Sequence, residues 1–77
     1  MNIRELRNKL EESKVPSTYY TINGNLSSDI YVLEYVHGYW ESFYFDEKGN
    51  RNDYHRFNNE NDACQYFWKV IENEMRY

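Results

Sequence analysis

Two β-prone runs on either side of a His-Gly dipeptide constrain the fold of this chain most strongly. Residues 30–36 (IYVLEYV) and 39–45 (YWESFYF) are rich in the β-branched and aromatic residues that favour strands. A two-residue turn at His37-Gly38 would join them, because glycine accepts the backbone conformation that tight hairpin turns need. The pattern therefore predicts an antiparallel β-hairpin in the middle of the chain.

The N-terminal segment, from Asn2 to about Lys14, has the pattern of an amphipathic helix. Its apolar residues recur three and four positions apart, as they do on one face of a helix; they are Ile3, Leu6 and Leu10. Asn2 and Glu5 have the spacing of a capping box at the helix start. Pro16 ends the helix, because the residue before a proline is disfavoured in the helical conformation.

The C-terminal segment, from Asn59 to about Met75, predicts a second helix. Its apolar stripe consists of Ala63, Cys64, Phe67, Trp68, Ile71 and Met75. Asn58 or Asn59 would cap the start, and Glu60 and Asp62 would lie in the first turn, where the helix dipole favours negative charge. On this stripe Cys64 is expected to be a small buried residue.

Shorter segments complete the predicted fold. Residues 18–22 are β-prone, and a turn at residues 46–50 leads to a further strand around residues 53–57. A chain of 77 residues forms one small core. We therefore predict a single α+β domain over residues 1–77, with an N-terminal helix, a three- to four-stranded antiparallel sheet and a C-terminal helix packed on one face.

The hairpin register predicts which face of the sheet meets the helices. A turn at residues 37–38 places Glu34 opposite Glu41, and two carboxylates in that position repel each other and are costly to bury. We expect this face to meet water, together with its apolar residues Ile30, Val32, Phe43 and Phe45. We expect the other face to pack on the helices, through Tyr31, Leu33, Trp40 and Tyr44. An exposed apolar patch with an acidic rim is typical of a protein-binding surface.

Charge is concentrated in the middle third of the chain. Residues 15–47 contain five carboxylates and nine aromatic rings but no lysine or arginine, whereas the two flanks are close to neutral. The formal charge of −4 therefore comes from this segment. Acidic groups around large rings suit a basic protein partner and argue against binding the nucleic-acid backbone. The predicted partner-binding residues are Asp29, Glu34, Tyr39, Glu41, Phe43, Asp46 and Glu47.

Other classes of site find little support in the sequence. His37 and His55 are the only histidines, and the spacing of His and Cys does not match a metal site. No nucleophile, base and orienting group are grouped together, so we predict no catalytic, metal or cofactor site. The N-terminus lacks the apolar run of a signal peptide, and no stretch approaches about 18 apolar residues. We therefore expect a cytoplasmic protein.

Four segments resemble the small immunity proteins of bacterial contact-dependent inhibition and polymorphic toxin systems. They are NIRELRNKLEE, YYTINGNLSSDIYVLE, WESFYFDEKGNR and RFNNENDACQYF. The resembling positions include Trp40, Glu47, Gly49, Phe57, Ala63, Cys64, Tyr66 and Phe67. The turn at residues 46–49 (DEKG) is an imperfect version of the family's acidic-basic-glycine turn. The resemblance implies a protein that binds a cognate toxin domain, often a nuclease, in a one-to-one complex and covers its active site or substrate channel.

Two other functions stay open at this point. The chain could be an acidic adaptor or antitoxin-like regulator of another basic protein. It could also be a small nucleic-acid-binding module that stacks bases on its tyrosine-rich sheet, although the shortage of basic residues opposes this. An enzyme is the least favoured class.

Overall fold

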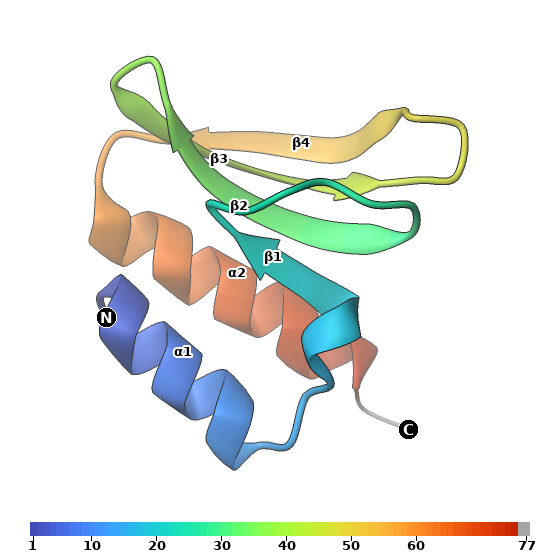
Figure 1. Ribbon diagram of the computed structural model, residues 1–77. Helices are drawn as coiled ribbons and strands as arrows, with labels where there is room; N and C mark the ends of the chain where they lie inside the picture. The colour runs from blue at the N-terminus through green and yellow to red at the C-terminus, as the bar shows by residue number, and fades with distance from the viewer. Residues whose placement is uncertain (76–77) are drawn as a thin grey trace.

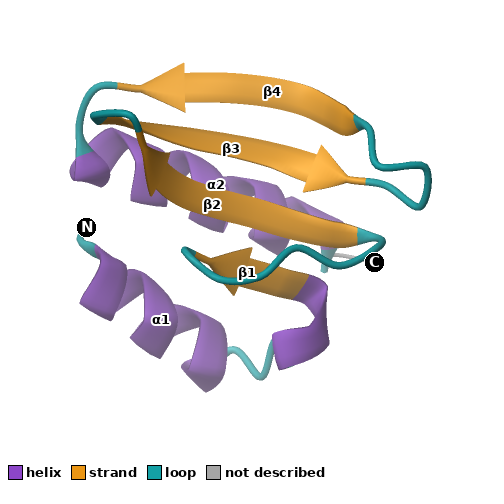
Figure 2. Ribbon diagram, turned by 45° about the horizontal axis from the view of Figure 1, so that its top comes forward, coloured by secondary structure: helices purple, strands orange, loops and turns teal. Residues whose placement is uncertain are grey.

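A computed structural model describes residues 1–75, which form a sheet layer and a helix layer (Figure 1). In chain order the elements are α1 (Ile3–Glu12), the 3-10 turn η1 (Ser17–Tyr19), β1 (Tyr20–Ile22), β2 (Ile30–Val36), β3 (Tyr39–Phe45), β4 (Arg51–Phe57) and α2 (Glu60–Glu74). Figure 2 shows both helices on the same side of the sheet. The predicted α+β class and order of elements are confirmed.

The sheet is mixed, with the strand order β1-β2-β3-β4. β2, β3 and β4 pair antiparallel as predicted, whereas β1 runs parallel to β2. Two parallel neighbours need a connection that returns the chain to the end of the sheet where it started. Residues 23–29 make this return without forming a helix or strand.

The central hairpin has the predicted register. Glu34 pairs with Glu41, and Val36 pairs with Tyr39 at the turn. His37 and Gly38 have φ angles of 54° and 86°. Two positive φ angles are the mark of a type I′ turn, whose twist matches that of the flanking strands.

Both helices begin at the predicted capping residues. In α1 the Asn2 side chain accepts a hydrogen bond from the Glu5 backbone N–H at 2.9 Å, and the Glu5 carboxylate accepts one from the Asn2 N–H at 2.9 Å. In α2 the Asn59 side chain accepts from the Asp62 N–H at 2.8 Å. These bonds satisfy backbone donors that have no partner within the helix.

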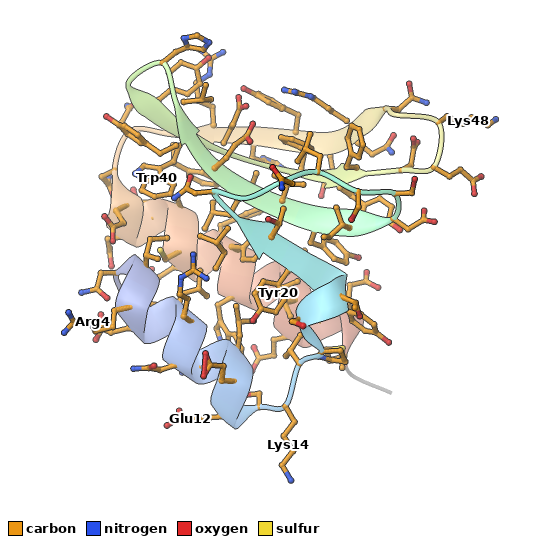
Figure 3. The ribbon with its side chains drawn as sticks, viewed as in Figure 1. Arg4, Glu12, Lys14, Tyr20, Trp40 and Lys48 are labelled. Carbon is orange, nitrogen blue, oxygen red and sulfur yellow. The ribbon has the colours of Figure 1, made fainter. Side chains whose placement is uncertain are left out.

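The main core lies between the sheet and the two helices. Its central buried residues are Leu6 and Leu10 of α1, Leu33 of β2, Trp40 of β3, and Phe67 and Ile71 of α2. Figure 3 shows Trp40 and Tyr20 in the space between the layers. The face predicted to pack on the helices is therefore confirmed.

The opposite face of the sheet, here called the outer face, is covered as well. Ile30, Val32 and Phe43 form a second buried cluster, against which Leu26 and Phe45 pack. The prediction that these apolar residues lie open to water was wrong. The segment between β1 and β2 contributes to this burial, because its Leu26 packs against the cluster.

β4 forms one edge of the sheet and contains a bulge. The register of β3 and β4 shifts between Ser42 and Tyr44, and Asp53 on β4 has a φ of 54°. A bulge of this kind redirects side chains. Here the Asp53 carboxylate accepts a hydrogen bond from the Tyr66 hydroxyl of α2 at 3.3 Å. β4 begins two residues earlier than the sequence predicted.

Burial of the outer face can be tested with two matched valines of β2. Val32 is fully buried, whereas Val36 is only partly buried at the hairpin end of the same face. We expect Val32→Ala to lower the free energy of unfolding by about 1–2 kcal/mol and Val36→Ala by less than about 0.5 kcal/mol. Urea denaturation measures both values. Equal small losses would mean that the outer face is open to water.

Candidate functional site

The predicted partner-binding residues separate into two groups in the structure. Glu34, Tyr39, Glu41 and Phe43 belong to the outer face, on β2 and β3. Asp29, Asp46 and Glu47 lie at the end of the sheet opposite the His37-Gly38 turn. The two groups differ in exposure and in the partners of their carboxylates.

Two members of the outer-face group are buried. Glu41 is 4% exposed and Phe43 is 2% exposed. The Tyr54 ring of β4 stacks on Phe43 with 6.2 Å between ring centroids, and the Arg51 guanidinium lies 4.7 Å from the centre of the same ring. Long side chains of β4 thus cover the centre of β3, which corrects the expectation that the Glu34/Glu41 face meets water.

Two side chains of β4 compensate for the free-energy cost of burying the Glu41 carboxylate. The Tyr54 hydroxyl donates a hydrogen bond to Glu41 Oε2, and Arg51 Nη1 lies 3.6 Å from Glu41 Oε1. A buried carboxylate is tolerated when it is hydrogen-bonded and paired in this way. Glu41 is therefore a structural residue in this fold.

The two cross-strand glutamates have opposite pKa shifts. Burial raises the pKa of Glu34, and the hydrogen bond and negative charge of Glu41 raise it further. Burial alone would raise the pKa of Glu41 too, but hydrogen bonds from Tyr54 and Glu34 and the charges of Arg51 and Arg56 outweigh it and lower the pKa. A proton held by the pair therefore resides on Glu34.

A second arginine covers another ring of the outer face, that of Tyr39. The Arg56 guanidinium lies 4.1 Å from the centre of the Tyr39 ring. With Arg51 beside Glu41, two arginines balance the two glutamates of this face. The outer face is thus not the one-signed acidic patch that the sequence predicted, and its rings at Tyr39 and Phe43 are already stacked by cations rather than free to stack bases.

The second group of predicted residues comes together as an acidic surface. β2 begins where β3 ends, since Ile30 pairs with Phe45. Asp29 therefore lies beside Asp46 and Glu47 although 16 residues separate them in sequence. The Tyr44 hydroxyl donates to Asp29 Oδ1 at 3.3 Å. Burial raises the pKa of Tyr44, as do the charges of Asp29, Asp46 and Glu47.

Asp46 also builds the β3–β4 turn. Its carboxylate accepts hydrogen bonds from the backbone N–H groups of Lys48 at 3.0 Å and Asn50 at 2.8 Å, and from the Asn52 side chain at 2.8 Å. The hydrogen bond from Asn52 contributes most to the lowering of the Asp46 pKa. These donors are backbone N–H groups and an asparagine side chain, which carry no charge. The charged side chain of Lys48 points away from the turn (Figure 3). Asp46 therefore keeps its negative charge.

The structure adds two carboxylates that the sequence analysis did not select, Asp53 and Glu74. Burial raises the pKa of Tyr31 to about 12, with Glu74 and Asp53 among the other causes. The 15-residue α2 is about 22 Å long and a seven-residue strand about 23 Å, so the last turn of α2 reaches the end where β2 begins. The similar lengths of the predicted helix and strand were the signal from which the position of Glu74 at this end could have been inferred. We call Asp29, Asp46, Glu47, Asp53 and Glu74 the acidic end.

The remaining candidate residues have structural surroundings. His37 occupies the hairpin turn, and the His55 ring packs on Tyr66 with 4.6 Å between centroids. Burial raises the pKa of the Cys64 thiol to about 11, which suppresses the reactive thiolate. Within residues 1–75, no three His, Cys, Asp or Glu side chains are placed to hold a metal ion. In the same range no helix has the length and apolar character to cross a membrane.

The glutamate pair predicts a specific pH dependence of stability. A carboxyl group with a raised pKa stabilises the fold fully below its unfolded pKa, and this contribution is lost as the pH rises through the folded pKa. Glutamine at position 34 does not ionise, so the variant does not lose this stability as the pH rises. We expect Glu34→Gln to raise the free energy of unfolding at pH 7 by about 0.2–1 kcal/mol and to leave it unchanged at pH 3, as measured by urea denaturation.

Glu41→Gln is the matched control and should behave in the opposite way. Its lowered pKa contributes stability above the unfolded pKa, which is lost as the pH falls through the folded pKa. This variant should therefore be less stable than the parent at pH 7. Stabilisation by both substitutions would show that Tyr54 and Arg51 do not hold the Glu41 carboxylate.

The chain was compared with protein-family models, with curated proteins and with solved structures, and none of them matched. The resemblance to immunity proteins therefore stays a prediction. Most positions that carry it have structural roles here. Ala63, Cys64 and Phe67 are buried in the main core, and Gly49 has a φ of 81° in the β3–β4 turn.

Proposed function

We propose that this chain is an immunity protein that binds and neutralises a basic toxin domain, such as a nuclease, in a one-to-one complex in the cytoplasm. The binding surface in this proposal is the acidic end. Of the residues predicted for partner binding, Asp29, Asp46 and Glu47 belong to this surface. Glu41 and Phe43 are buried beneath the side chains of β4 on the outer face and therefore have structural roles.

One observation carries the proposal, namely the convergence of carboxylates from separate parts of the chain. Asp29 precedes β2, Asp46 and Glu47 follow β3, Asp53 lies on β4 and Glu74 ends α2. A helix C-terminus adds partial negative charge at the same end. Lys48 and Arg51 lie at the same end, but the five carboxylates outnumber them. A surface with net negative charge steers a partner of opposite charge and accelerates association.

The surface also offers apolar area beneath its charges. Tyr31 and Tyr44 are half-buried, and their rings pack against each other with 4.8 Å between centroids. Tyrosine rings of this kind are common anchors in the centre of protein interfaces. A nuclease must present a basic surface to its nucleic acid, and a rigid acidic surface with central rings is complementary to it.

A nucleic-acid-binding function is less well supported by the geometry. The acidic end repels phosphates, and the cations of the outer face already contact rings or the Glu41 carboxylate. The adaptor alternative uses the same acidic surface as the immunity function. Protection from a toxin distinguishes these two, because an adaptor would give none.

The first test is a survival assay. The C-terminal fragment of the protein encoded immediately upstream is expressed in cells with and without this chain, and the two proteins are then copurified. We expect the fragment to be toxic alone, and the pair to be harmless and to elute as a one-to-one complex. A harmless fragment, or a toxic one that this chain neither binds nor blocks, would refute the proposed function.

Charge reversal then locates the surface. Glu47 and Glu74 are exposed, and lysine at position 74 suits the end of a helix. We expect Glu47→Lys with Glu74→Lys to keep the fold and to slow association with the toxin domain about tenfold at low salt, since the steering field reverses. Stopped-flow binding at two ionic strengths measures the effect.

The matched control is Glu11→Lys with Glu12→Lys on α1, which makes the same change in net charge at two exposed positions. It should slow association much less than the pair at the acidic end. Equal slowing by the two double variants would show that net charge, rather than this surface, directs the encounter.

A further inference from the structure

We draw no further inference here: the strongest candidate, the exposed edge of the sheet along β4, carries a bulge at Asp53 and exposed arginines at positions 51 and 56, which are features that protect an edge from pairing with another strand, and nothing among the described residues 1–75 shows what covers it.

Discussion

The pairing of β2 with β3 determines both faces of this small protein. Its register places Leu33 and Trp40 toward the helices, and Glu34 opposite Glu41 on the outer face. A shift by one residue would exchange the faces and place the glutamates in the main core. The type I′ turn at His37-Gly38 excludes that shift, because a two-residue turn allows one register only. Packing of both helices depends on this local constraint.

The same register creates the main electrostatic difficulty of the fold, which β4 resolves. Two carboxylates face each other on a sheet whose outer side is covered by Leu26 and by long side chains. Tyr54 and Arg51 supply a hydrogen bond and a positive charge to Glu41, and Glu34 retains its proton more readily. Burial of Phe43 and neutralisation of Glu41 are thus achieved by one strand, which was predicted only in part.

Features set by neighbours in sequence were predictable, and those set by distant segments were not. The hairpin register and the caps at Asn2 and Asn59 follow from local turn and capping chemistry. The parallel pairing of β1 depends on the path of residues 23–29, for which the sequence contains no periodic signal. Of the candidate site, the convergence of Asp29 with Asp46 and Glu47 follows from the hairpin. Asp53 and Glu74 join them through a bulge and a helix length, which are tertiary features.

The partner of each carboxylate decides whether its charge is available for binding. Glu41 is held by an arginine, so its field is cancelled a few ångströms away and a distant partner experiences little of it. Asp29 and Asp46 are held by a tyrosine hydroxyl, backbone N–H groups and an asparagine, which fix the carboxylates without neutralising them. Uncharged donors therefore fix the positions of these carboxylates and leave their negative charge to act on a partner. By this criterion the acidic end is suited to recognition of a basic partner, and the glutamates of the outer face serve the fold.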